Sequence, residues 1–285
     1  TYQMKIVADY VRILRPLNIL ISAVTVLACA DILNALENIP LLIYTILTVC
    51  LFIGGANIFN DIQDKKEDKI NKPDRPIAAE IISLKAAGNY AKLLVISGAG
   101  MCFLLPLSAA LVAWIIALPL TIVYSLKLKS IPIAGNGVIS FLLGLTFLFC
   151  GLVFENIIPM IIPAGLAFSL TFVRELTKDI EDMDGDKRSG LSTFPIMFGL
   201  DKAVQLVILL SLATGILSLI PYFIKIYSVF YLIPLVLGVE LPLTIVVFLF
   251  MKSHSRSTAR KSSILLKTAT IMGIISIYTG ATLGT

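Results

Sequence analysis

Long apolar stretches alternate with short polar segments along the whole chain. Nine stretches are apolar enough, at about 20 residues each, to cross a hydrocarbon core of roughly 30 Å as helices. They cover residues 17–34, 39–59, 88–107, 109–125, 136–154, 157–173, 204–224, 227–250 and 264–282. The residue-by-residue alternation typical of membrane β-barrel strands is missing from them. The pattern predicts an all-α, polytopic membrane protein, with about nine transmembrane helices in a bundle around a central cavity and one domain over residues 1–285.

The composition supports a chain surrounded by membrane lipids. Hydrophobic residues make up 58% of it and charged residues only 14%, whereas soluble domains carry about 25% charged residues. The net charge of +5 arises from short loops beside the apolar stretches, so we expect no nucleic-acid partner, and nothing indicates an obligate protein partner. The first residues lack the pattern of a cleavable signal peptide, so none is expected.

The polar loops predict the orientation in the membrane. Loops 60–87, 126–135, 174–203 and 251–263 follow the second, fourth, sixth and eighth stretches, so all of them emerge on the side of the N-terminus. That side holds 22 of the 23 Lys and Arg residues, and only Lys225 falls on the other. Positive charge accumulates on the cytoplasmic side of membrane proteins. We therefore expect a multi-pass protein of the cell membrane with these loops in the cytoplasm.

The first of these loops begins with a cluster of oxygen-bearing side chains. On a helix, four of them share a face about 60° wide: Asn57, Asp61, Asp64 and Asp68, with Asn60 beside them. The same projection turns Glu67 away. Carboxylates at this spacing repel one another, and a divalent cation relieves the repulsion. Mg²⁺ prefers oxygen ligands and combines one or two carboxylates with substrate phosphates.

A second acidic cluster follows the sixth apolar stretch. Its members again fall within about 60° on a helix: Glu175, Asp179, Asp182 and Asp186. The neighbouring Glu181 and Asp184 point away from that face. Two acidic faces on one side of the membrane predict two half-sites around one polyanion, in which carboxylates hold Mg²⁺ and the metal holds a diphosphate.

Basic residues near both clusters complete the predicted site. Fixed cations stabilise a leaving diphosphate, although each lysine alone also fits a role in topology. Candidate cations are Arg75, Lys127, Lys129 and Lys178. The predicted metal ligands are Asn60, Asp61, Asp64, Asp68, Asp179, Asp182 and Asp186. The predicted catalytic residues are Asp64, Asp68, Asp179, Asp182, Lys178 and Arg75.

These residues resemble the signatures of a known family. The segment Asn60-Asp61-xx-Asp64-xxx-Asp68-xx-Asn71-x-Pro73-x-Arg75-Pro76-Ile77 resembles the first signature of the UbiA superfamily of intramembrane prenyltransferases. The segment Arg174-Glu175-xx-Lys178-Asp179-Ile180-Glu181-Asp182-xx-Gly185-Asp186 resembles the second. Glu80 departs from the pattern, because the family usually has glycine there.

The resemblance implies a Mg²⁺-dependent prenyltransferase whose partners are an isoprenoid diphosphate and a lipid acceptor. The wording of the second segment is most similar to the archaeal members that make ether lipids. They transfer a geranylgeranyl group from geranylgeranyl diphosphate to the glycerol hydroxyl of geranylgeranylglyceryl phosphate and release diphosphate. The resemblance further implies a diphosphate and prenyl pocket formed by Asn18, Asn57, Asn60, Tyr124, Lys127 and Lys129.

Two alternative functions remain at this point. The same chemistry on an aromatic acceptor would serve quinone or haem biosynthesis. A cation transporter would need ionisable residues along a path through the membrane, where the sequence offers only Glu240. That residue either faces a cavity or bonds to backbone near a helix break at Pro242. Several aromatic residues fit either a tunnel wall or ordinary packing: Phe141, Phe147, Phe149, Phe168 and Phe172. We expect His254 to be exposed.

Overall fold

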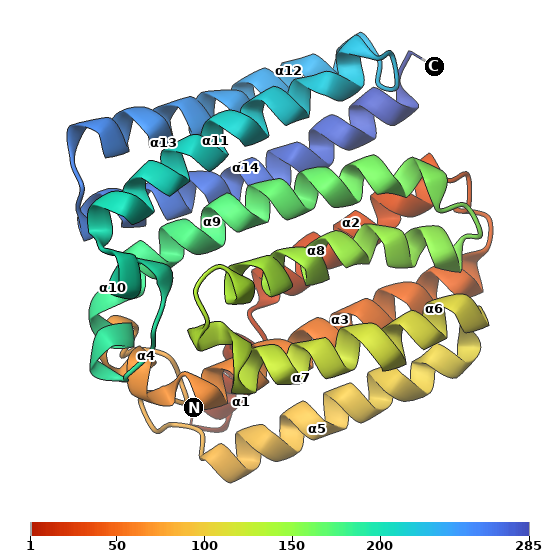
Figure 1. The fold of residues 1–285 in the computed structure, drawn as a ribbon. Coiled ribbons are helices and arrows are strands. Elements are labelled where there is room, and N and C mark those ends of the chain that lie inside the picture. The colour runs from red at the N-terminus through yellow and green to blue at the C-terminus, as the bar shows by residue number, and fades with distance from the viewer. Residues whose placement is uncertain (1, 285) are drawn as a thin grey trace.

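The computed structural model describes residues 2–284, and over that part of the chain it contains helices and no strands. Figure 1 shows the long helices lying side by side in one bundle. The first half of the chain contains α1 (Tyr2–Ile13), α2 (Pro16–Ile32), α3 (Ile39–Gln63), α4 (Lys65–Asn71), α5 (Leu84–Met101), α6 (Leu107–Leu111), α7 (Leu118–Leu126) and α8 (Ala134–Val153). The second half contains α9 (Ile161–Arg188), α10 (Phe194–Phe198), α11 (Leu200–Phe223), α12 (Leu232–Leu235), α13 (Leu241–Lys252) and α14 (Arg256–Thr282).

The number of membrane-crossing segments agrees with the sequence. Eight helical segments between residues 39 and 282 are long and apolar enough to span a bilayer. A ninth is possible when α1 and α2, which meet at a bend of 51°, are taken together. The bend occurs at Arg15, whose φ of 56° is left-handed, directly before Pro16. A polytopic helical protein is thereby confirmed.

The polar connections gather at one end of the bundle. In Figure 1, α1, α4, α10 and the links from α7 to α8 and from α13 to α14 lie at the same end, and the C-terminus lies at the other. This is the shared side that the positions of the loops predict. The lone basic residue of the opposite side, Lys225, follows the end of α11. The candidate site residues are therefore presented at one face of the bundle.

Two helices extend well beyond their apolar parts. The predicted stretch 157–173 continues in α9 to Arg188, and α14 begins at Arg256 instead of residue 264. Polar side chains on these extensions bond to each other: Ser263 donates to Glu181 at 2.8 Å, and Arg256 pairs with Asp184. The second acidic cluster is consequently part of a continuous helix.

Two transmembrane helices change register just before a proline. The segments Val112–Ala117 and Val236–Glu240 are π-helical, and Pro119 and Pro242 follow them. Proline cannot donate to the preceding turn and clashes with it, and an extra residue in that turn accommodates the change. The register change places Glu240 against α11, where its carboxylate accepts a hydrogen bond from Ser218. The intramembrane carboxylate thus has a packing partner within the bundle.

Candidate functional site

A polar cavity lies at the loop end of the bundle, between α2, α3, α4, α8, α9 and α14. Seven carboxylates and seven cations line it, together with amide and hydroxyl groups. Twelve residues predicted from the sequence are among its lining: Asn18, Asn57, Asn60, Asp64, Asp68, Arg75, Tyr124, Lys129, Lys178, Asp179, Asp182 and Asp186. Nearly all of the predicted site residues therefore meet in one place.

The second acidic cluster has the geometry that helical periodicity predicts. Its four predicted members, on one face of α9, all line the polar cavity. The two carboxylates predicted to point away do so: Glu181 bonds to Ser263 and Asp184 pairs with Arg256. Asp179 accepts a hydrogen bond from Asn136 of α8 at 2.9 Å. Contacts with α8 on one side and with α14 on the other therefore fix the orientation of this face of α9.

The first acidic cluster is not one continuous helix face, which corrects the sequence prediction. Helix α3 ends at Gln63, and α4 begins at Lys65 after a break at Asp64. The break changes the register, so Glu67, which was expected to point away, lines the polar cavity. The sequence contains neither glycine nor proline at the break, so no local signal marked it.

Asp61 lies outside the lining of the polar cavity, although we expected it to be a metal ligand. Its side chain is only 4% exposed and lies between two guanidinium groups, those of Arg15 and Arg75. The Arg75 Nη1 to Asp61 Oδ1 distance is 2.9 Å, and Arg75 also reaches Asp68 at 2.6 Å. Two arginines satisfy this carboxylate, so its position is that of an anchor for the cations.

The two lysines after α7 differ in their placement. Lys129 lies in the polar cavity and pairs with Asp64 at 2.5 Å. Lys127 is exposed and is not among the lining residues. The prediction that both belong to the pocket is therefore wrong for Lys127.

The two clusters contact each other across a sequence separation of 111 residues. The Asn71 side-chain amide donates to the Asp182 carbonyl at 3.0 Å, and Lys72 pairs with the Asp182 carboxylate at 2.8 Å. A Cβ atom at Gly185 would collide with the Asn71 side chain. Glycine at this position of α9 thus leaves room for the Asn71 side chain that joins α4 to α9.

Amide and hydroxyl groups line the side of the cavity near α3. Asn57 donates to the Leu14 carbonyl at 2.9 Å, and Asn60 accepts from Ser125 at 2.7 Å. Tyr124, next to Ser125, is buried at the same place. These contacts fix the amides on α3 while both still line the cavity.

Burial and charge shift the pKa of several groups around the break. Burial raises the pKa of Asp68, against the opposing effect of Arg75. Burial also raises the pKa of Glu67. Burial by itself lowers the pKa of Arg75, but the carboxylates of Asp61 and Asp68 outweigh it and raise that pKa. Acids that are hard to ionise beside firmly charged cations indicate a site that favours additional positive charge.

Several oxygen atoms around the cavity are available to a cation. Glu67 Oε2 and Asn71 Oδ1 are buried and have no hydrogen-bond partner within residues 2–284. In the same part of the chain, no three carboxylates already form a ready-made metal cage. Mg²⁺ is compatible with this donor set, because it commonly takes one or two carboxylates and completes its shell with water and substrate phosphates.

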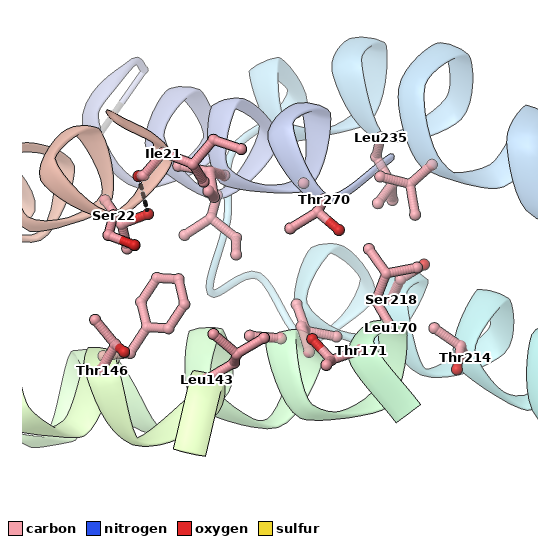
Figure 2. Close-up of a pocket in the computed structure, with 18 of the residues that line it drawn as sticks. Ile21, Ser22, Leu143, Thr146, Leu170, Thr171, Thr214, Ser218, Leu235 and Thr270 are labelled. Atoms are coloured by element: carbon pink, nitrogen blue, oxygen red, sulfur yellow. Dashed lines mark hydrogen bonds between the residues drawn. The ribbon is translucent and has the colours of Figure 1, made fainter. Parts of the chain in front are cut away.

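Two apolar cavities open from the polar cavity on either side of α8. Cavity A, of about 820 Å³, lies between α2, α8, α9, α11 and α14 and is lined by residues such as Thr25, Phe147, Leu170, Leu235 and Ile277. Figure 2 shows its side chains converging from these helices. Cavity B, of about 920 Å³, lies between α3, α7 and α8 and is lined by residues such as Phe52, Ala113, Thr121, Leu142 and Phe149. Apolar side chains form most of both linings, as is usual in pockets that bind organic ligands.

The aromatic residues left open by the sequence divide between two roles. Phe147 lines cavity A and Phe149 lines cavity B. Phe141 and Phe168 are exposed, and Phe168 stacks on Phe172. His254 is exposed as expected, and its ring lies 2.5 Å from Asp201.

Five charged residues that line the polar cavity had no predicted role: Arg15, Glu67, Lys72, Arg174 and Lys267. Lys72 and Arg174 lie within the two recognised segments, so the motifs themselves could have indicated them. Lys267 lies in an apolar stretch of α14 outside both motifs. Only the fold brings it to the site.

Comparisons with known proteins agree with this arrangement. The UbiA prenyltransferase family matches residues 19–271. The chain is 34% identical to the digeranylgeranylglyceryl phosphate synthase of Methanosphaera stadtmanae, over 95% of this chain and 98% of that one, and 36% identical to that of Methanobrevibacter smithii, over 95% and 97%.

Solved structures show the same fold. A digeranylgeranylglyceryl phosphate synthase superposes with a TM-score of 0.76 at 28% identity, covering 97% of this chain and 99% of that one. A UbiA homologue from Archaeoglobus fulgidus, bound to GPP and Mg²⁺, superposes with a TM-score of 0.64 at 19% identity, covering 94% and 99%. With its paired acidic segments around one cavity, the chain belongs to the UbiA prenyltransferase family and is a membrane-embedded prenyltransferase.

Proposed function

We propose that the chain transfers a geranylgeranyl group from geranylgeranyl diphosphate to the glycerol hydroxyl of geranylgeranylglyceryl phosphate, which gives the product that its relatives are named for. The observation that carries this proposal is the pair of apolar cavities meeting at one polar cavity. Donor and acceptor each bring one long isoprenoid chain to the reaction. A small aromatic acceptor would need only one such cavity.

The donor's chain occupies cavity B in this proposal. The residues that line both cavity B and the polar cavity are two amides, a phenol and three aliphatic side chains: Asn57, Asn60, Tyr124, Ile53, Ile139 and Leu143. The diphosphate would then lie next to Asp64 and Lys129. The Tyr124 ring would lie near the first carbon of the chain, where an aromatic face can stabilise developing positive charge.

The transfer breaks the bond between that carbon and the diphosphate oxygen, and the diphosphate leaves with the electron pair. Three cations would stabilise the leaving anion: Arg75, Lys129 and Lys178. The glycerol oxygen forms the new ether bond and loses its proton to water, diphosphate or a carboxylate.

Mg²⁺ is the proposed cofactor. Its candidate ligands, by their position around the cavity, are Asn60, Asp64, Asp68, Asp179, Asp182 and Asp186, with Glu67 and Asn71 added by their unpaired oxygens. When bound, the metal would supply positive charge to the diphosphate. Prenyl transfer should vanish in EDTA and return with Mg²⁺, and undiminished transfer in the chelator would remove this role.

The acceptor is tested directly with detergent-solubilised protein. Geranylgeranyl diphosphate is supplied with geranylgeranylglyceryl phosphate or with an aromatic quinone precursor, and prenylated products are separated by chromatography. The proposal predicts product only with the glycerol phosphate lipid. Product only with the aromatic acceptor would replace the proposed function with the alternative reaction.

We further infer that the polar cavity opens toward the cytoplasm of the cell. The shared side of the loops and its excess of Lys and Arg support this orientation. Single cysteines near Asp68, Lys129, Asp184 and Ser255 should all react with a membrane-impermeant reagent from the cytoplasmic side only. One position labelled from outside would contradict the orientation.

A further inference from the structure

The polar cavity carries an unequal distribution of charge. Near the break after α3, carboxylates match the cations: Lys129 pairs with Asp64, and Arg75 pairs with both Asp61 and Asp68. Around the middle of α9, Arg174 and Lys178 share the single carboxylate of Glu175, at 3.3 and 3.1 Å.

Lys267 adds a further positive charge to this part of the cavity. It is partly buried on α14 and lines the polar cavity together with the cations Arg174, Arg15 and Lys178. No carboxylate within the described residues lies at ion-pair distance from it. Partly buried cations held together in this way repel, and a bound anion would relieve the repulsion.

Arg174 and Lys267 lie in the polar cavity next to the entrance of cavity A. On α9, Arg174 faces the polar cavity, and Thr171 and Ala167, three and seven residues earlier on the same side, line cavity A. On α14, Lys267 faces the polar cavity, Thr270 lines both cavities and Ile274 lines cavity A. Each of the two helices therefore places a cation in the polar cavity and continues as a wall of cavity A. Figure 2 shows Thr171 and Thr270 facing each other across cavity A.

Helix α2 completes the path between the two cavities. Asn18 lines the polar cavity, Ile21 and Ser22 line both, and Thr25 lines cavity A. The entrance is thus continuous from the cations to the apolar interior. The mouth of cavity B differs, because amides and a phenol surround it instead of lysine and arginine.

We propose that Arg174 and Lys267 bind the phosphate of the acceptor lipid and that cavity A holds the acceptor's isoprenoid chain. This inference rests on the proposed function and assigns its second substrate site. In the acceptor, the hydroxyl lies between the phosphate and the ether-linked chain. Fixing both ends would leave that hydroxyl facing the donor across the polar cavity.

The phosphate half of the proposal is tested by steady-state kinetics of the full chain in detergent. Lys267→Gln is compared with Lys261→Gln, a matched control at an exposed position of the same helix. Two acceptors are used, geranylgeranylglyceryl phosphate and geranylgeranylglycerol, which lacks the phosphate. Lys267→Gln should raise the KM of the phosphorylated acceptor about tenfold to a hundredfold, as expected for a lost charge-assisted hydrogen bond.

The remaining kinetic constants make the result specific. The KM of geranylgeranyl diphosphate and that of the acceptor without phosphate should stay within about twofold, and Lys267→Arg should restore binding. An increase in the donor KM instead would assign these cations to the diphosphate and overturn the inference. Equal changes for both acceptors would exclude phosphate recognition. If the wild-type protein does not use the glycerol phosphate acceptor at all, the proposed function itself fails.

The assignment of the acceptor's chain to cavity A is tested at two glycines where an added Cβ would meet no clash: it would lie 3.8 Å from Val239 at Gly273 and in open space at Gly165. Gly273 lines cavity A, whereas Gly165 of α9 lies outside it. Gly273→Leu should reduce transfer to an acceptor with a twenty-carbon chain more than to one with a ten-carbon chain, with the donor KM unchanged. Gly165→Leu should behave as wild type. Loss of donor binding in Gly273→Leu would place the donor's chain in cavity A and overturn the assignment.

Discussion

The two acidic segments have similar compositions but are built differently. The second lies on the uninterrupted helix α9, and its outward carboxylates are tied to α14 by Ser263 and Arg256. The first is divided by the break at Asp64, and two arginines hold its Asp61 away from the cavity. Helical periodicity identifies site residues correctly only where the helix continues. After the change of direction at Asp64, Glu67 lines the cavity and Asp61 does not.

The strongest test of this comparison is a pair of substitutions in the second segment. Asp182→Asn removes a carboxylate that lines the cavity and pairs with Lys72, and should lower the rate about a hundredfold or more. Asp184→Asn removes an outward carboxylate paired with Arg256 and should have little effect, as is usual for exposed ion pairs. Both are measured as initial rates of prenyl transfer at equal amounts of folded protein. Equal losses would contradict the helical face.

In the first segment, Asp61→Asn should act on stability. It leaves Arg15 and Arg75 without their shared buried carboxylate, which should reduce the free energy of unfolding by about 2–3 kcal/mol. This is less than for a fully buried ion pair, because both arginines are partly exposed. The midpoint of thermal unfolding in detergent measures this. Asp201→Asn, at an exposed pair with His254, is the control. An unchanged midpoint combined with weaker Mg²⁺ binding would show that Asp61 is a metal ligand and not an anchor for the arginines.

A smaller effect distinguishes the broken helix from a continuous one. Glu67→Gln removes a cavity-lining carboxylate and should slow prenyl transfer about tenfold. A continuous helix would turn this residue away and make the change silent. Glu80→Gln, at an exposed glutamate of the same loop region, is the matched control. Equal rates for wild type and Glu67→Gln would refute the register that the break produces.

The smallest effect is expected at Glu80, where the family usually has glycine. Its φ of 60° is left-handed, a conformation that favours glycine, but hydrogen bonds from Lys69 and Lys65 lower its pKa from 4.5 to about 2. The ion pairs therefore contribute fully above about pH 4.5 and are lost as the pH falls toward 2. Glu80→Gly should change the unfolding midpoint little at pH 7. As the pH is lowered, the variant should become more stable relative to wild type, because only wild type loses the ion pairs. A constant difference at all pH values would exclude the role of the ion pairs.

The sequence predicted the apolar spans, the common side of the loops and the face of α9, because each depends on a regular local pattern. It did not predict the break at Asp64, since the direction of α4 is determined by long-range contacts of Asn71 and Lys72 with α9. Lys267 was missed for the same reason. Its place in the cavity depends on the packing of α14 beside α9, and no neighbouring residue in the sequence indicates it.

The contact of Asn71 with the backbone of Asp182 also bears on how the protein is made. The two residues are separated by 111 positions, so the first acidic segment is synthesised long before its counterpart. During that interval Asp61 can already bind Arg15 and Arg75, both of which belong to the earliest part of the chain. Such early neutralisation would protect the nascent chain from binding ions or misassociating before α9 has been synthesised. The buried Asp61 carboxylate, held by two arginines, can thus keep the first half of the site in shape until the second half has been synthesised.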